Sequence, residues 1–218
     1  MHAPIALMTP MANPTVEREM RLLLPSESDY VVGRLVSDVE DSRERLVRYA
    51  EELGQSLTQF GGMPLSAVAF ACTASSYLIG IERERDLAGQ LDVPVLWAAA
   101  VIRDELVRRD VGRVAVISPY PEPIHRAGLA YWSSSGFEIA FDARVEIGSN
   151  DTRRIYDLAG SEAEGAIARA REIGPDAILL SGTGMPTLAL LDPQGSPPII
   201  SSNHCLAQAM MRSQGINP

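Results

Sequence analysis

The chain contains few cysteines and few histidines, and this scarcity argues against metal centres and disulfide frameworks. Its 218 residues include 2 cysteines and 3 histidines. Cys72 and Cys205 alone cannot form a disulfide framework, and the histidines are scattered rather than paired at metal-ligand spacing. No loop matches a dinucleotide fingerprint or a phosphate-binding glycine motif. We therefore expect no metal ion and no cofactor.

Basic residues and long apolar runs are also lacking. The chain has 19 Lys and Arg against 28 Asp and Glu, a net charge of −9 that disfavours nucleic acid and anionic membranes as partners. No run approaches the ~20 apolar residues that span a bilayer, and no secretion signal is recognisable. With 46% hydrophobic residues, the composition indicates a globular protein, which we expect in the cytoplasm.

One sequence pattern of apolar runs occurs twice in the chain. Residues 5–10 and 114–119 are both apolar runs that end in a hydroxyl residue and a proline. Residues 68–74 and 178–184 form a second pair. A third pair follows in the same order, and all three separations are roughly 105 to 110 residues. A duplicated α/β half explains this order better than chance does.

Strand-like apolar runs alternate with amphipathic stretches, which is typical of a parallel sheet crossed by helices. The sequence predicts helices over 98–109, 161–173 and 203–214, and a strand over 65–71. One further helical face is predicted to consist of Val39, Leu46, Ala50, Leu53 and Leu57. The predicted fold class is therefore α/β.

The repeat divides this predicted fold into two pseudo-symmetric, flavodoxin-like parallel-sheet domains with the active site at their junction. Residues 1–110 are expected to form the first half and residues 111–198 the second. We expect residues 199–218 to pack back onto the first half. The polar stretch 150–154 can be either a solvated loop or a lid.

Small and hydroxyl residues follow the predicted strands at their carboxyl ends, where parallel α/β sheets bind ligands. Such loops leave backbone N–H groups free at helix starts, and these groups bind carboxylate or phosphate. A small anion is therefore the expected ligand. Cys72 stands at such a turn, where amides lower a thiol pKa, although a cysteine after a buried strand can equally be a core residue. Cys205 lies inside a predicted helix.

Five segments resemble the aspartate/glutamate racemase superfamily, in its maleate isomerase and arylmalonate decarboxylase branch. They span the chain and read Thr9-Pro-Met-Ala-Asn13, Phe70-Ala-Cys-Thr-Ala-Ser-Ser76, Ile117-Ser-Pro-Tyr-Pro121, Ile178-Leu-Leu-Ser-Gly-Thr-Gly184 and Ile200-Ser-Ser-Asn203. The resemblance implies cofactor-free chemistry on carbon acids that bear carboxylates. It implies catalytic roles for Cys72 and Tyr120, and substrate-binding positions at Asn13, Thr73, Ala74, Asn150, Gly182, Thr183, Gly184 and Asn203.

One departure from this resemblance bears on the reaction. Racemases and maleate isomerases of the superfamily use a cysteine from each half, whereas Gly182 stands at the second position here. Moving a proton from one face of a carbon to the other needs two groups, while decarboxylation needs a single proton donor. We therefore expect an arylmalonate-decarboxylase-like enzyme with Cys72 as the proton donor, although in those decarboxylases the cysteine lies in the second half.

Two alternatives remain open. Cys72 can act as the nucleophile or base of a maleate cis–trans isomerase or a racemase-like enzyme. Alternatively, loss of the second cysteine can leave a small-acid binding protein without turnover. In each case the expected partner is a small carboxylate or dicarboxylate. The sequence leaves the oligomeric state open, with a homo-oligomer as one possibility.

Overall fold

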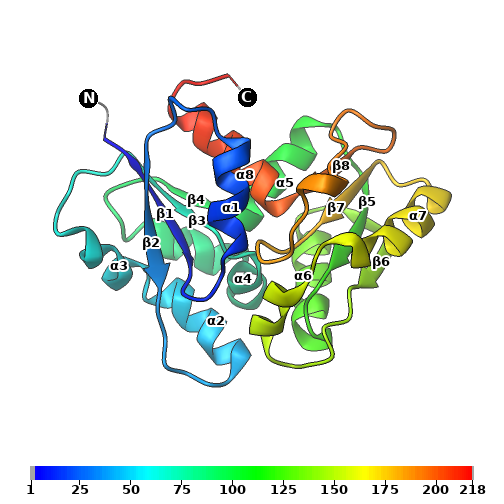
Figure 1. The fold of residues 1–218 in the computed structure, drawn as a ribbon, viewed down its shortest axis with the longest axis horizontal. Coiled ribbons are helices and arrows are strands. Elements are labelled where there is room, and N and C mark those ends of the chain that lie inside the picture. Colours follow the sequence, from blue (N-terminus) through cyan, green and yellow to red (C-terminus); the bar gives the residue numbers. More distant parts are fainter. Residues whose placement is uncertain (1–2, 218) are drawn as a thin grey trace.

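The computed structural model describes residues 3–217, which form two four-stranded parallel sheets lying side by side (Figure 1). The first sheet has the order β2-β1-β3-β4 and the second the order β6-β5-β7-β8. Each half therefore repeats one strand order, with β5 in the place of β1 and β7 in the place of β3. This arrangement confirms the α/β fold class with two pseudo-symmetric sheets.

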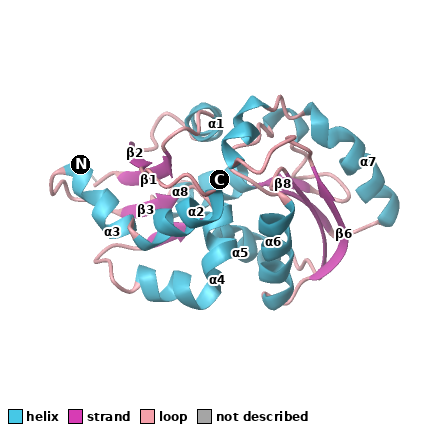
Figure 2. Ribbon diagram, turned by 90° about the horizontal axis from the view of Figure 1, so that it is seen from below, coloured by secondary structure: helices cyan, strands magenta, loops and turns pink. Residues whose placement is uncertain are grey.

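The strands are short. The first sheet consists of β1 (Ile5–Pro10), β2 (Tyr30–Leu35), β3 (Ala67–Phe70) and β4 (Val95–Trp97). The second consists of β5 (Arg113–Ser118), β6 (Glu138–Arg144), β7 (Ala177–Leu180) and β8 (Ile199–Ser201). The inner strands β1, β3 and β7 are buried along their whole length. They are nearly continuous apolar runs because helices cover both faces of each sheet (Figure 2).

Eight α-helices are present in the described residues. They are α1 (Thr15–Leu23), α2 (Ser42–Glu51), α3 (Leu53–Ser56), α4 (Thr73–Ala88), α5 (Ala98–Arg108), α6 (Glu122–Ser134), α7 (Glu164–Ile173) and α8 (Ser202–Ser213). Four short 3-10 helices are η1 (Leu57–Phe60), η2 (Thr152–Asp157), η3 (Ser161–Ala163) and η4 (Leu188–Leu190). Within residues 3–217, no helix has the length and apolar character needed to cross a membrane.

The predicted helical face that includes Leu46 starts at Val39, but helix α2 begins later, at Ser42. Asp41 caps α2 by accepting a hydrogen bond from the Glu44 backbone N–H at 2.8 Å, so Val39 lies before the helix. The helical stretch is then divided into α2, α3 and η1. The predicted helix over 161–173 likewise consists of η3 followed by α7.

The C-terminal segment differs from the expectation. Strand β8 pairs with β7 in the second sheet, in the register Ile178↔Ile199, so residues 199–201 belong to that sheet and not to the first half. Helix α8 turns back and packs against α5 and α1, as Figure 1 shows. The division of the chain into two domains at 110 stays a prediction.

The halves meet closely where α4 packs against α6. Tyr77 of α4 reaches across this junction, and its Oη lies 2.6 Å from the Oγ of Ser181. Its ring also packs against Gly128 of α6, where an added Cβ would come within 3.0 Å of Tyr77 Cδ2. The Oγ1 of Thr183 donates to the Ala71 carbonyl oxygen at 2.8 Å, so the carboxyl ends of β3 and β7 lie together.

Candidate functional site

Cys72 lies where β3 passes into α4. It is the N-cap residue of α4, in an extended conformation with φ −147° and ψ 100°, and the residue is 3% exposed. The Ser75 hydroxyl, one turn into the helix, donates to Cys72 Sγ at 3.2 Å. The thiol therefore faces the first turn of α4, as the strand-to-helix pattern predicts.

Burial and hydrogen bonding act in opposite directions on this thiol. Burial raises the pKa of Cys72 above its ordinary value, while the Ser75 hydroxyl and the backbone N–H groups of Ser75 and Ala74 lower it. Burial is the larger effect, so the thiol is protonated at neutral pH in the resting state. Cys205 is completely buried within α8, and burial raises its pKa as well.

A small cavity of about 20 Å³ adjoins the Cys72 side chain, enough space for one water molecule. Both halves supply its walls, which are Pro10, Asn13, Leu46, Cys72, Ala74, Tyr120, Thr152, Ile155, Tyr156, Thr183 and Gly184. Six of these were predicted from the sequence, namely Asn13, Cys72, Ala74, Tyr120, Thr183 and Gly184. A dicarboxylate needs more room, so these walls must move apart to admit one.

Two hydroxyls form a pair beside the thiol. Thr73 Oγ1 and Tyr120 Oη lie 2.8 Å apart, and both residues are buried. Burial, and secondarily the nearby Cys72, raise the pKa of Tyr120 well above its ordinary value, so its hydroxyl stays neutral. One hydroxyl donates to the other, which leaves one proton free for a third partner.

Two of the predicted carboxylate-binding side chains are engaged by the protein itself. The hydroxyl proton of Thr183 goes to the Ala71 carbonyl, as described above. Asn203 Nδ2 donates to Glu19 Oε2 at 2.7 Å and to the Thr183 carbonyl oxygen at 3.1 Å, which occupies both of its N–H groups. Asn13 keeps more freedom, because its Nδ2 has only a long 3.5 Å contact to Thr183 Oγ1.

Glu19 of α1 is a functional candidate that the sequence reasoning missed. It is 2% exposed and accepts hydrogen bonds from the Thr187 and Leu188 backbone N–H groups as well as from Asn203. Its carboxylate therefore ties α1 to the loop that follows β7. The available signal was an acidic residue in the same helical stripe as Val16 and Met20, which are buried.

Gly182 adopts a backbone conformation that favours glycine. Its φ is +134°, and an added Cβ would lie 3.0 Å from Pro119 Cδ and 3.4 Å from Tyr120 Oη. Its N–H donates to Ser202 Oγ at 2.9 Å. A side chain at this position would therefore be strained and would press on the wall that carries Tyr120.

The structure does not bring Asn150 to Cys72. Asn150 is exposed and lines a surface groove of about 390 Å³ together with Ser42 and Pro121. The cavity wall comes instead from η2, through Thr152, Ile155 and Tyr156. These three residues lie in a short 3-10 helix, and the sequence marked only Thr152, as part of the polar stretch 150–154.

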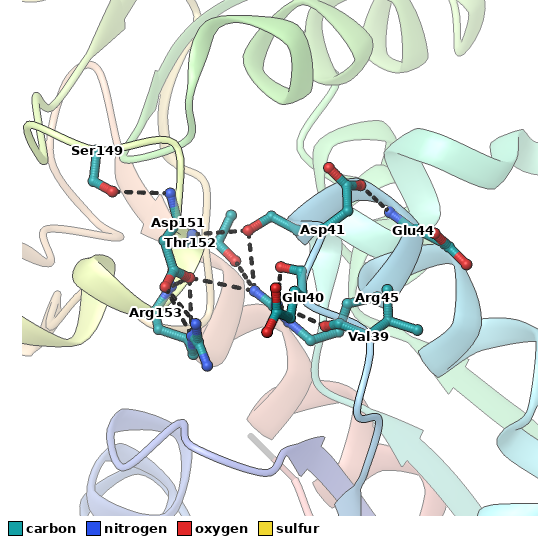
Figure 3. Close-up of polar contacts among 10 residues, drawn as sticks. Val39, Glu40, Asp41, Glu44, Arg45, Ser149, Asp151, Thr152 and Arg153 are labelled. Atoms are coloured by element: carbon teal, nitrogen blue, oxygen red, sulfur yellow. Dashed lines mark hydrogen bonds and ion pairs between the residues drawn. The ribbon is translucent and has the colours of Figure 1, made fainter.

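Arg45 holds this wall in place across the two halves (Figure 3). Its buried guanidinium donates to the Val39 and Glu40 carbonyl oxygens at 3.0 and 2.9 Å. It also donates to Asp151 Oδ1 at 3.3 Å and to Thr152 Oγ1 at 3.4 Å. Helix α2 of the first half is thereby fastened to η2 of the second, directly beside the cavity.

Comparisons with known proteins agree with this geometry. A maleate isomerase of Pseudomonas putida is 21% identical over an alignment that covers 98% of this chain and 92% of that protein. A Nocardia farcinica maleate cis–trans isomerase variant with a covalently bound succinylcysteine intermediate has a TM-score of 0.80 at 23% identity, covering 98% of this chain and 93% of its own. A double variant of arylmalonate decarboxylase, with glycine changed to cysteine and cysteine to serine, has a TM-score of 0.80 at 18% identity. The match covers 98% of this chain and 93% of the decarboxylase chain.

No protein-family model matches the chain. The structural likeness establishes the fold, which is that of the maleate isomerase structures. The homologues are maleate isomerases and arylmalonate decarboxylases, which confirms the resemblance to this branch of the aspartate/glutamate racemase superfamily. Within residues 3–217, no three His, Cys, Asp or Glu side chains are grouped to hold a metal ion.

Proposed function

We propose that the protein is a cofactor-free cis–trans isomerase of a small unsaturated dicarboxylate such as maleate, with Cys72 as the nucleophile. The observation that carries the proposal is the position of Cys72, which lines the cavity between the halves at the first turn of α4. The curated relatives support this reaction over decarboxylation, because the named ones are maleate isomerases matched along nearly the whole chain.

The reaction needs the thiolate. The Cys72 proton leaves to solvent while the site is open, and the Ser75 hydroxyl and the amides at the start of α4 stabilise the resulting charge. The sulfur then adds to one alkene carbon, and the π electrons move to the other carbon and into its carboxylate. Rotation about the new single bond and departure of the sulfur give the trans isomer.

The single cysteine is compatible with this route. Addition, rotation and elimination move no proton between the faces of a carbon, so a second acid at position 182 is not required. The Nocardia farcinica variant, in which a cysteine has been replaced, carries a succinylcysteine intermediate, so that protein forms a covalent adduct without the replaced cysteine. The Thr73 and Tyr120 hydroxyl pair, with one free proton, is placed to stabilise the carboxylate that receives the negative charge.

A decarboxylase is the second candidate, favoured by two observations. The resting thiol is neutral because burial raises the pKa of Cys72, and a neutral thiol is the species that protonates a carbanion. Gly182 removes a second thiol from the site. The arylmalonate decarboxylase variant that gains a cysteine and loses another is similar in fold to this chain.

The two candidates are separated by offering the protein maleate and an α-aryl-α-methylmalonate in parallel and following both by NMR in D2O. Isomerase activity gives fumarate without deuterium at carbon and leaves the malonate intact. Release of CO2 from the malonate with maleate unchanged would replace the first proposal by the second. Saturable binding of either acid without any product would refute both.

A further inference from the structure

A dicarboxylate presents two charged ends, and a buried carboxylate is stable only when hydrogen-bond donors surround it. Tyr120 lines one side of the cavity, and its hydroxyl is free to donate there when Thr73 donates to it. Thr183 and Asn203 supply no side-chain proton, because their donors are engaged within the protein. The second carboxylate therefore needs donors from elsewhere in the wall.

Tyr156 of η2 has the required properties. It lines the cavity, and its ring edge lies against Gly184, where an added Cβ would come within 2.7 Å of Tyr156 Cε1. Its hydroxyl has no hydrogen-bond partner among residues 3–217, in contrast to the hydroxyls of Tyr120, Tyr77 and Tyr131. Burial and then the neighbouring Cys72 raise the pKa of Tyr156, so the hydroxyl remains a neutral donor near the sulfur.

Few other side chains of this wall can play that part. Pro10, Leu46 and Ile155 are apolar and lack any donor. Thr152 Oγ1 accepts from the Arg45 guanidinium at 3.4 Å, which fixes its position but leaves its hydroxyl proton able to assist. Asn13 has one free N–H and can assist, but its Oδ1 is fixed by the Thr15 backbone N–H at 2.9 Å.

We propose, resting on the function proposed above, that Tyr156 is a specificity-determining residue whose hydroxyl donates a hydrogen bond to the second carboxylate of the substrate. The protein thereby distinguishes dicarboxylates from monocarboxylates of the same shape. The residue takes part in binding from η2, the part of the wall that Arg45 fastens to α2.

The test compares Tyr156→Phe with a matched control, Tyr49→Phe. Tyr49 is a buried tyrosine of α2 in the same neighbourhood, but it does not line the cavity. Binding is measured as protection of Cys72 from iodoacetamide, followed by mass spectrometry of the peptide, with succinate as the dicarboxylate and propionate as the monocarboxylate. Neither acid has a double bond to react, so the measurement does not depend on turnover.

Tyr156→Phe is expected to weaken succinate binding roughly tenfold or more, the usual effect of losing a hydrogen bond to a charged group, and to leave propionate binding unchanged. Tyr49→Phe is expected to change neither. An equal loss for both acids, or no loss for succinate, would overturn the inference. If discrimination disappears in the variant while the wild type forms no fumarate, the inference stands and the proposed reaction fails. If the wild type isomerises maleate but the variant binds succinate normally, only the inference fails.

Discussion

The loops after β3 and β7 occupy equivalent places in the two halves but have different structures. After β3 the chain enters α4 at once, and Cys72 caps this helix, which is kinked at Gly80 (φ 78°, ψ 168°). After β7 no α-helix follows directly, and the loop containing Gly182 is irregular up to η4. The first loop presents a reactive side chain, while the second presents backbone in a conformation that favours glycine. The two halves therefore share one strand order, while their loops after β3 and β7 differ in structure.

The second loop is organised by the first half rather than by its own helix. Thr15 Oγ1 donates to the Gly184 carbonyl oxygen at 2.7 Å, and Glu19 accepts from the backbone of Thr187 and Leu188. A loop without a helix dipole or a local cap needs such external partners to hold its backbone. We call the loop after β7 the scaffold loop, because it presents backbone, whereas the loop after β3 presents the Cys72 side chain. Variants in the loop after β3 should lose activity, and variants in the scaffold loop should lose stability.

The largest expected effect follows from removing the thiol of the first loop. Cys72→Ser should lower turnover by at least about a hundredfold, because serine is a far weaker nucleophile and acid, while binding of succinate remains. Steady-state rates and a binding isotherm measure the two parts. Cys205→Ser is the matched control and should retain activity, and equal losses in both variants would remove the distinction between the two cysteines.

The next effect concerns the scaffold loop. Glu19→Ala should lower the free energy of unfolding by about 2–4 kcal/mol, since the variant leaves several buried donors without an acceptor. Urea denaturation followed by circular dichroism measures this change. Glu164→Ala, at an exposed acid on α7, should cost less than about 1 kcal/mol. Similar values for the two variants would show that Glu19 does not hold the loop.

Gly182 offers a sharper test of the same loop. Gly182→Ala and Gly182→Cys should both lower stability by about 1–3 kcal/mol, because each places a Cβ on a residue with φ +134° close to Pro119. Thermal melts of both proteins check this expectation. The alanine variant isolates the cost of the Cβ, so any further difference belongs to the thiol. A fully stable Gly182→Cys protein that also exchanges substrate protons in D2O would mean that the second loop readily accepts the missing acid.

The smallest expected effect is a shift in the pH dependence of Cys72 alkylation. Because burial raises the pKa of Cys72, its folded-state alkylation by iodoacetamide should be slow below about pH 8.5 and should increase above it. The sign follows from the reactive species, since a raised pKa keeps the unreactive thiol populated to higher pH. Alkylation rates of native and urea-unfolded protein measure the shift. A native midpoint below that of the unfolded chain would mean that the amides and Ser75 outweigh burial.

The sequence predicted the parts of the site that follow from strand ends. Asn13, Cys72, Tyr120 and Thr183 each follow a predicted strand, and the carboxyl ends of parallel strands converge whatever the loops between them do. The two-sheet fold was accessible for the same reason, because the repeated apolar runs mark equivalent strands. The final strand was assigned to the wrong half, since three residues carry too little pattern to choose between two sheets.

What the sequence could not supply depends on long-range contacts. Tyr156 reaches the cavity from the short 3-10 helix η2, whose start is bound by Arg45, far away in the chain. Asn203 appeared free to bind substrate, but its amide is occupied by Glu19 across the junction. Hydrogen-bond partners between distant segments leave no local periodicity, so residue type and spacing alone do not reveal them.

The proposed isomerisation makes Cys72 the nucleophile of a site with one thiol. It is tested most directly by quenching the protein with acid during reaction with maleate and mapping the covalent adduct by peptide mass spectrometry. We expect fumarate formation together with a succinyl adduct on Cys72, and neither in the Cys72→Ser variant. Isomerisation that continues in Cys72→Ser, or an adduct on Cys205 instead, would contradict it.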